Sequence, residues 1–382
     1  MPSFKQCLSG LALLSYLQPL VQSILLPKPG GKYLIGTKTM YFQDVDKLDP
    51  FAPGPEVRRV MTSTFFPVAS DEDCYPLQTV KYMPPRTAKE TDKKFERLGV
   101  PKKSFEELEL SVCREGATVD STKHVLIFSP DLGVSRLLYT AIATEVASAG
   151  YIVILLDHSY DGDIVEFSKH DIIWGAEIRS NAQKELDLAT RADDASFILD
   201  HLSQAMWSSV LFPGIEDPLS LRHVGIFGHG LGGATAAVAM QNDSRIVAGI
   251  NLDGAFPRSA QHLNLDKPFL LFGHDGHNHH EVPSWTTFYD NLKTNEKFDL
   301  TLFKSDQYTF TDLPLLVLND VLNLEKVLHP EVKKALETVK GKRAMKILRV
   351  YIDAFFGLAL NDAATDMLTK NDSRFPEVGI VK

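Results

Sequence analysis

GIFGHGLGGATAA (225–237) runs from an apolar segment into a tight, glycine-rich corner and leaves that corner as a small, alanine-rich stretch. A buried strand, a sharp turn and a helix in this order predict a nucleophile elbow, which has the frame G-x-S-x-G. The middle position of the frame, where the serine belongs, is Gly230. The stretch therefore predicts the backbone of the elbow without its nucleophile.

The segments around the elbow alternate between apolar runs and amphipathic stretches. Continuous apolar runs are typical of strands buried in a parallel sheet. The expected strands are 124–129, 151–157, 223–228, 246–253, 268–273 and 298–304, and the expected helices are 136–149, 181–203, 234–240, 283–293 and 325–361. This alternation predicts an α/β protein with a mainly parallel, doubly wound sheet, in the α/β-hydrolase fold.

The residues before this pattern are expected to add an antiparallel part to the sheet. Two strand-like runs, 32–42 and 59–68, are joined by the proline-rich segment 49–55 and predict an antiparallel pair. Residues 84–105 are polar and charged and contain prolines, so we expect an excursion of the chain over the surface.

The N-terminus has the pattern of a secretory signal peptide, residues 1–23. Lys5 precedes an apolar stretch over 8–17, and small or β-branched residues lead to Ser23. We expect cleavage after Ser23, which leaves residues 24–382 as one α/β-hydrolase domain in the secretory pathway. The alternative is a buried first helix, which the proline and the serine near the end of the stretch disfavour.

The composition of the chain limits which kinds of partner and compartment we expect. The chain of 382 residues is long enough for one large domain, and its net charge of −9 argues against nucleic acid as a partner. Beyond the N-terminal stretch, no apolar run is long enough for a transmembrane helix. Cys74 and Cys113 remain after cleavage, and two cysteines alone leave a disulfide undecided. Sequons at Asn242 and Asn371 fit a secreted glycoprotein.

The order of strands also predicts where catalytic residues lie. In this fold the nucleophile, the acid and the histidine follow one another along the chain, near the carboxyl ends of strands. Gly230 stands at the nucleophile position, and Asp253 closes the next strand, where the acid belongs. The loop after the last expected strand, residues 304–312, contains no histidine.

Nine stretches, in order along the mature chain, resemble one known family. They are 26–37, 49–54, 128–143, 157–167, the elbow, 251–257, 268–273, 310–316 and 375–378. With these stretches the chain resembles the platelet-activating-factor acetylhydrolases, specifically their secreted fungal and bacterial members. The resemblance implies a serine esterase that releases short or oxidised acyl chains from the middle position of phospholipids, with no metal or other cofactor.

The resemblance also shows where this chain departs from the family. The nucleophile serine of the family falls on Gly230, the acid falls on Asp253, and the histidine falls on Gln307. The first oxyanion segment, S-P-G-L-G in the family, reads S-P-D-L-G at 129–133, which introduces Asp131. Glycine offers no atom to attack a carbonyl, and a glutamine amide cannot accept a proton at neutral pH. The triad is therefore degenerate at two positions.

What remains is a shaped pocket with some of the family's polar groups. We expect Asp253 and Asp131 to be the catalytic residues, because an unpaired buried carboxylate has a raised pKa that suits proton transfer. We expect two backbone N–H groups to form an oxyanion hole. The expected binding residues are Gly230, Gln307, Leu132 and Leu231.

Several of these residues have a plain structural alternative. Asp131 can serve only to occupy a left-handed backbone position, and Asp253 can serve only to cap the turn that follows it. His229 is expected beneath the strand ends rather than as a substitute nucleophile. The histidine-rich loop HDGHNHHE (274–281) suggests a metal, but the sequence offers no second group of ligands, so we predict no metal site.

Three functions remain open. The leading hypothesis is a repurposed catalyst of a non-hydrolytic step, such as a cyclisation, a pericyclic closure, an isomerisation or an elimination, in fungal secondary metabolism. The second is a non-catalytic protein that binds a lipid or a regulatory partner. The third is a residual ester hydrolase in which Asp253 or Asp131 activates water directly. The expected ligand is an apolar small molecule or a lipid.

Overall fold

The computed structural model describes residues 23–382, apart from residues 213, 216, 319, 337 and 338. The expected signal peptide therefore lies outside the described residues, except for Ser23. Among the described helices, none is both long and apolar enough to cross a lipid bilayer.

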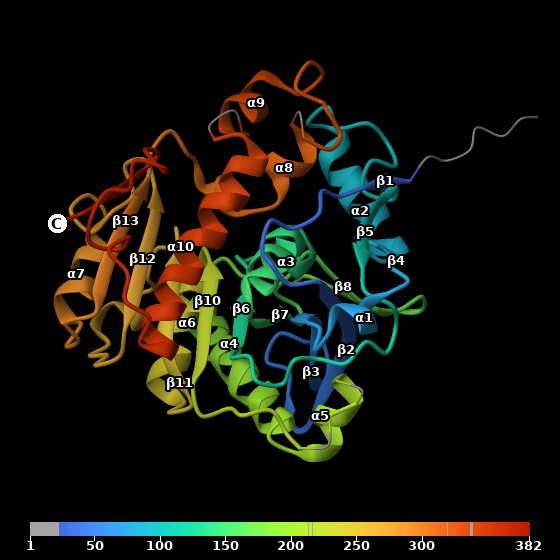
Figure 1. Ribbon diagram of the computed structural model, residues 1–382, viewed down its shortest axis with the longest axis horizontal. Coiled ribbons are helices and arrows are strands. Elements are labelled where there is room, and N and C mark those ends of the chain that lie inside the picture. The colour runs from blue at the N-terminus through green and yellow to red at the C-terminus, as the bar shows by residue number, and fades with distance from the viewer. Residues whose placement is uncertain (1–22, 213, 216, 319, 337–338) are drawn as a thin grey trace, which may run out of the picture.

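A nine-stranded sheet forms the centre of the molecule (Figure 1). Its strands are β2 (Ile35–Leu48), β3 (Val57–Pro67), β6 (Val125–Ser129), β7 (Ile152–His158), β10 (Val224–His229), β11 (Ile246–Leu252), β12 (Phe269–His274), β13 (Lys297–Leu302) and β14 (Val378–Ile380). Their order is β14-β13-β12-β11-β10-β6-β7-β3-β2, and every pair from β13 to β7 is parallel. β2, β3 and β14 join antiparallel. The predicted sheet, with its antiparallel N-terminal part, is therefore confirmed.

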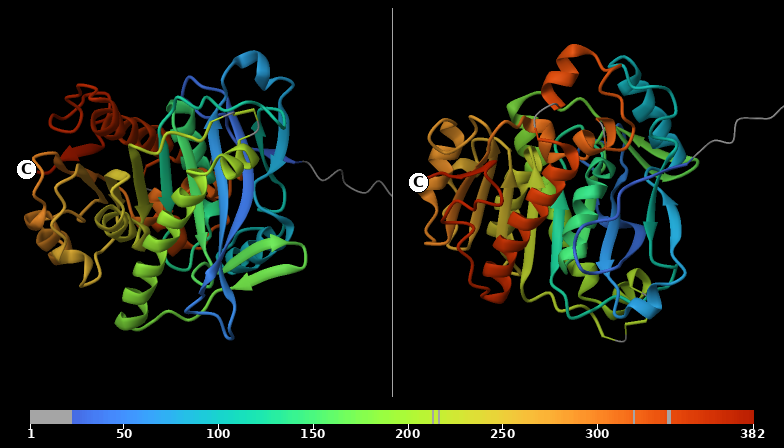
Figure 2. Two further views of the ribbon diagram at one scale, coloured as in Figure 1. Left: turned by 90° about the horizontal axis from the view of Figure 1, so that it is seen from below. Right: turned by 45° about the horizontal axis from the view of Figure 1, so that its top comes forward.

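Helices cover both faces of this sheet (Figure 2). They are α3 (Thr140–Ala149) and α10 (Gly341–Asn361) on one face, and α4 (Asn181–Leu202) and α6 (Leu231–Asn242) on the other. Alternate residues of a strand point to opposite faces, so Leu126 and Phe128 pack with the first pair of helices, while Val125 and Ile127 pack with the second. This explains why the parallel strands are apolar throughout rather than alternating.

The remaining elements surround the sheet. The helices are α1 (Asp71–Cys74), α2 (Pro85–Glu96), α5 (Ala205–Leu211), α7 (Pro283–Asn291), α8 (Leu313–Val317) and α9 (Pro330–Leu336). A small sheet joins β1 (Ile24–Leu25), β5 (Leu108–Val112) and β4 (Gln78–Lys81), and β8 (Ile164–Ser168) pairs with β9 (Asp171–Trp174) as a hairpin. The disulfide that the sequence left undecided joins Cys74 to Cys113.

The expectation for residues 84–105 was incomplete. Residues 85–96 form the helix α2, which begins at a proline and buries one face. Its buried residues are Thr87, Ala88, Thr91, Asp92 and Phe95, which recur at the spacing of a helix. Only two of these five side chains are apolar, so hydrophobic periodicity did not reveal the helix.

Candidate active site

A pocket of about 780 Å³ opens at the carboxyl ends of the central parallel strands. Its apolar wall includes Leu132, Leu231 and the segment 255–257, and charged residues of α4 and of the loop after β11 form its rim. All six residues expected at the site line this one pocket: Asp131, Leu132, Gly230, Leu231, Asp253 and Gln307. Their placement follows from the strand order, and their roles stay predictions.

The elbow has the backbone that the sequence predicted. Gly230 lies between β10 and α6 with φ +56° and ψ −126°, a conformation that side chains strongly disfavour. Its N–H donates to the carbonyl oxygen of Leu252 at 3.0 Å. A Cβ atom built on Gly230 would overlap the carboxyl group of Asp131. The carboxyl group thus fills the space that a serine side chain would need.

The Asp131 carboxylate occupies the expected oxyanion hole. Its Oδ1 atom accepts hydrogen bonds from the backbone N–H groups of Leu132 and Leu231, each at 2.8 Å. Its Oδ2 atom accepts a hydrogen bond from Nε2 of Gln307 at 3.1 Å. The three positions at which the sequence predicted a departure from the family pattern, 131, 230 and 307, therefore lie together in one cluster.

The left-handed alternative for Asp131 is wrong. Asp131 is not among the described non-glycine residues with positive φ, whereas Asp253 is, with φ +59°. Asp131 is held by its surroundings instead. Its N–H donates to the hydroxyl of Tyr139 at 3.3 Å, and that hydroxyl bonds to Nδ1 of His229 at 2.9 Å. His229 is buried, and burial lowers its pKa, so it lies beneath the strand ends as expected.

Asp253 is paired with histidine, contrary to the expectation that its carboxylate lacks an imidazole. Nδ1 of His274, the last residue of β12, lies 2.7 Å from Oδ1 and 2.8 Å from Oδ2 of Asp253. The backbone N–H of His274 also donates to Oδ1 at 2.9 Å. The acid of the site therefore has a histidine partner from a neighbouring strand rather than from the loop after β13.

The charges of this pair stabilise each other. Burial raises the pKa of Asp253, but hydrogen bonds from His274 and His277 outweigh it and lower the pKa to about 2. The hydrogen bond to Asp253 raises the pKa of His274, against the opposing effect of burial. Asp253 is therefore ionised at neutral pH, so the expected raised pKa of this carboxyl is wrong.

Some histidines of the histidine-rich loop lie at the site, and others bond to residues outside it. Nδ1 of His277 lies 3.0 Å from Oδ1 of Asp253. His279 bonds to Asp299 at 2.7 Å, and His280 bonds to the carbonyl oxygen of Lys382 at 2.8 Å. Sequence reasoning missed His274 and His277 as site residues. The available signal was that His274 directly follows a predicted strand, at the edge where Asp253 ends its own strand.

Asp253, His274 and His277 are also the described group whose donor atoms lie close enough to hold a metal ion, within 4.8 Å of one another. The argument that the histidine loop lacks a second ligand is therefore wrong, because β11 supplies a carboxylate. In the hydrogen-bonded arrangement both Nδ1 atoms donate to Asp253, and a metal would need both of them unprotonated. The absence of a metal stays a prediction.

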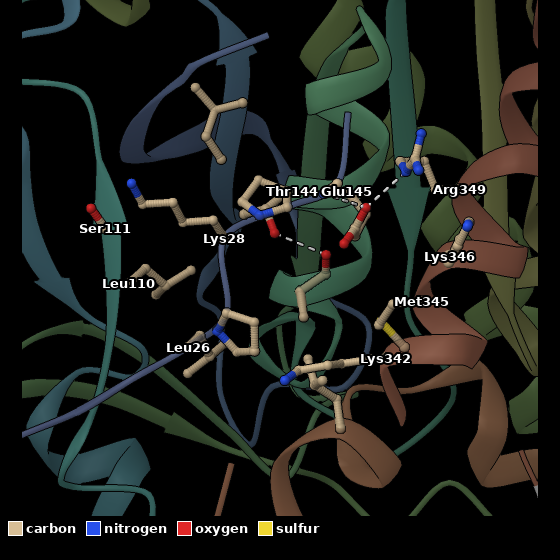
Figure 3. Close-up of a pocket in the computed structure, with 16 residues that line it drawn as sticks. Leu26, Lys28, Leu110, Ser111, Thr144, Glu145, Lys342, Met345, Lys346 and Arg349 are labelled. Carbon is tan, nitrogen blue, oxygen red and sulfur yellow. Dashed lines mark hydrogen bonds and ion pairs between the residues drawn. The ribbon is translucent and has the colours of Figure 1, made fainter. Parts of the chain in front are cut away.

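Two of the other cavities lie away from this edge, with volumes of about 390 and 1190 Å³. Figure 3 shows the first, where Glu145 and Arg349 form an ion pair in the wall, with an oxygen-to-nitrogen distance of 2.9 Å. None of the described residues lining either cavity is a histidine, an aspartate or a cysteine. Neither therefore offers a carboxylate–imidazole pair, and the pocket at the strand ends is the candidate active site.

Comparisons with known proteins show what the chain as a whole is similar to. Residues 93–197 match the family described as platelet-activating factor acetylhydrolase, isoform II. A probable 1-alkyl-2-acetylglycerophosphocholine esterase of Arthroderma benhamiae is 29% identical over 383 residues, which cover 93% of each chain. Platelet-activating factor acetylhydrolase of Cavia porcellus is 23% identical over 60% of this chain and 57% of its own.

A solved structure has the same fold. The ferulic acid esterase of Streptomyces cinnamoneus superposes with a TM-score of 0.76 and 27% identity, over 94% of this chain and 100% of that one. The proteins similar to this chain are thus esterases by their descriptions.

Proposed function

This chain is a platelet-activating-factor-acetylhydrolase-like α/β-hydrolase, and on that premise we propose that it hydrolyses small, apolar, ester-like lipids without a serine nucleophile. One observation carries the proposal: the Asp253–His274 pair opens into the same pocket as the backbone amides of Leu132 and Leu231. A carboxylate bonded to Nδ1 of an imidazole leaves Nε2 free to take a proton from water.

The chemistry follows from what each residue can do. Asp253 orients His274 and stabilises its imidazolium form, as an acid does in a Ser-His-Asp triad. Gly230 cannot form an acyl-enzyme, so water itself must attack the substrate. The residual-hydrolase alternative, which named Asp253 or Asp131 as the group that activates water, is thereby favoured in a modified form, with His274 as the base.

The apolar wall supports a lipid-like substrate. Leu132, Leu231 and Phe256 line the pocket beside its polar edge, as expected for a site that buries an acyl or alkyl chain. The fungal relative is described as acting on a glycerophosphocholine that carries an acetyl ester, which suggests a short acyl group.

A second candidate is the non-hydrolytic catalyst or binding protein expected from the sequence. It is favoured by the occupied oxyanion hole, because Oδ1 of Asp131 already accepts both amides that an ester carbonyl would need. The ester must displace this oxygen, so hydrolysis by wild-type protein should be slow. Exchange of Asp131 for glycine frees both amides, and it should raise ester hydrolysis if the first candidate is right.

We also propose that the protein acts in the secretory pathway. The N-terminal pattern of residues 1–23 and the disulfide between Cys74 and Cys113 support this location. The expected cleavage after Ser23 can be read from the mass of the secreted protein.

The proposal is tested with p-nitrophenyl acetate and short-chain phospholipid esters. Wild-type protein should hydrolyse them above the level of a denatured control and should not react with a fluorophosphonate. Asp253→Asn and His274→Gln should lower the activity by at least roughly 10²-fold, whereas His280→Gln, in the same loop but bonded to the C-terminal residue, should leave it unchanged. A rate for His274→Gln close to that of wild-type protein would contradict the proposal.

A further inference from the structure

We propose that Asp131 is itself a nucleophile and that the pocket hydrolyses small apolar epoxides through an aspartyl ester. The inference rests on the proposed function, because it uses the same Asp253–His274 pair to activate water. It goes beyond that function in the attacking atom and in the class of substrate.

The two oxygens of the Asp131 carboxylate are held differently. Oδ1 accepts the N–H groups of both Leu132 and Leu231, which fixes the orientation of the carboxylate plane. Among the described residues, Oδ2 accepts only the side-chain N–H of Gln307, an exposed residue of the pocket. One oxygen is thus anchored by rigid backbone, and the other faces a side chain that can turn away.

The position of the carboxylate matches that of the missing nucleophile. The carboxyl group lies where a Cβ atom on Gly230 would fall, at the elbow and beside the apolar wall. Asp131 lines the same pocket as His274. A carboxylate in this place can attack a bound electrophile, as aspartate and glutamate nucleophiles do in other hydrolases.

The anchoring of Oδ1 suits the second half of such a reaction. When Oδ2 becomes esterified, Oδ1 becomes the carbonyl oxygen of the ester and stays between the two amides. Water that attacks Cγ then places negative charge on Oδ1, where two backbone donors already point. The oxyanion hole therefore serves the enzyme's own ester rather than the substrate's carbonyl.

The same anchoring selects the substrate class. An acyl substrate would develop its oxyanion during the first attack, when both amides are taken by Oδ1. Attack at a saturated carbon develops no such oxyanion, but it needs a good leaving group. An epoxide supplies one through ring strain, and its oxygen needs only a proton.

The steps balance as follows. Oδ2 of Asp131 attacks an epoxide carbon, the carbon–oxygen bond breaks towards oxygen, and the alkoxide takes the proton of the His274 imidazolium. Neutral His274 then removes a proton from water, which adds to Cγ. The tetrahedral intermediate expels the alkoxide of the diol, which takes the remaining carboxyl proton. The products are a diol, the Asp131 carboxylate and the His274 imidazolium, from an epoxide and water.

Isotope labelling tests this route directly in the wild-type protein. The protein, in excess over styrene oxide, is allowed one turnover in water labelled with oxygen-18. We expect the label in the peptide that contains Asp131 and an unlabelled first diol, because the incoming oxygen of the diol is that of the carboxylate. Label in the diol alone, or no diol, would overturn the proposal.

Two variants provide a second test, in which diol formation and the mass of the protein are measured. Asp131→Asn keeps an oxygen for the two amides but loses the nucleophile, so diol formation should fall by roughly 10³-fold. His274→Gln should form the ester from styrene oxide only slowly and then fail to hydrolyse it, so intact mass should show an adduct on Asp131. His280→Gln should match wild-type protein in both measurements.

The two proposals fail in different ways. In one outcome, ester hydrolysis depends on His274, but Asp131 carries no label after exposure to styrene oxide. This outcome would overturn the inference and leave the proposed function standing. In the other outcome, Asp131 carries the label but no ester is hydrolysed. This outcome would support the inference and overturn the proposal that esters are substrates.

Discussion

Two aspartate–histidine pairs lie in this molecule with almost the same geometry and opposite surroundings. Nδ1 of His158 lies 2.7 Å from Asp194, and Nδ1 of His274 lies 2.7 Å from Asp253. Nε2 of His158 even lies 2.9 Å from the hydroxyl of Ser129, which completes a Ser-His-Asp arrangement. Yet the side chain of His158 is 1% exposed, whereas that of His274 is 31% exposed.

The geometry of a triad alone therefore does not make a catalytic site. Ser129 is buried with His158, so no substrate can reach its hydroxyl. Burial lowers the pKa of His158 despite the opposing hydrogen bond to Asp194. Asp194 also binds Arg58, which binds Asp49 in turn, so the pair belongs to a network that connects β3, β7 and α4. The buried pair holds elements together, and the open pair is free for chemistry.

The largest expected effect is on the open pair. His274→Gln removes the base, so ester hydrolysis should fall by roughly 10²- to 10⁴-fold. The melting temperature should change little, because the side chain is partly exposed and glutamine can still donate to Asp253. Steady-state kinetics and thermal unfolding on the same samples check both halves of the prediction. A fall in melting temperature that accounts for the lost activity would assign His274 a structural role.

The buried pair should respond in the opposite way. Asp194→Ala leaves Arg58 and His158 without their shared carboxylate, so the free energy of unfolding should fall by about 3–5 kcal/mol. Activity per folded molecule should be retained. Asp193→Ala is the matched control, because this neighbour makes an exposed ion pair with Lys47 and should cost less than about 1 kcal/mol. Equal losses in urea denaturation would refute the contrast.

A smaller effect is expected at the elbow. Gly230→Ser combines a positive φ with overlap against Asp131 and should destabilise the protein by about 1–3 kcal/mol. Gly116→Ser isolates the backbone strain, because Gly116 has φ +78° with open space around its Cβ position. Asp131→Gly, added to Gly230→Ser, should restore the stability that was lost through the overlap. Added to Gly116→Ser, it should restore none. A variant at Gly230 that melts higher than wild-type protein would contradict the placement of Asp131.

The smallest effect concerns pH. Three carboxylates, Asp253, Asp306 and Asp275, raise the pKa of His274, and burial opposes them. Ester hydrolysis needs the neutral imidazole, so the acidic limb of the rate profile should lie above the ordinary histidine value of about 6.5. The raised pKa stabilises the folded protein below that value, and this contribution is lost as the pH rises through the folded pKa.

Exchange of the carboxylate with the smallest effect, that of Asp275, provides the check on this acidic limb. Asp275 is exposed, so Asp275→Asn should move the limb towards lower pH by only a few tenths of a unit. A limb that moves towards higher pH would show that another group controls the rate.

Sequence alone could predict the backbone of the site and the neighbourhood of its residues. Parallel strands end at one edge, so the positions after β10, β11 and β13 had to meet, and Gly230, Asp253 and Gln307 do line one pocket. The six expected strands of the parallel part agree with the observed ones within two residues, whereas the expected run 32–42 ends six residues before β2 does. These features depend on apolar runs and on chain order, both of which are local.

The contacts made by side chains could not be predicted. Whether Asp131 points into the elbow depends on the empty space at Gly230, 99 positions away along the chain. The partner of Asp253 depends on which way His274 turns at the end of its strand. Residues after a strand have no periodic pattern that fixes their direction, so tertiary packing decides it.

The overlap between position 230 and the Asp131 carboxyl couples these two positions. A serine side chain at 230 would need the space that the carboxyl fills in its present orientation, so Gly230→Ser is accommodated only when the side chain at 131 moves or changes as well. Any attempt to install a serine nucleophile in this elbow must therefore treat the two positions as one unit.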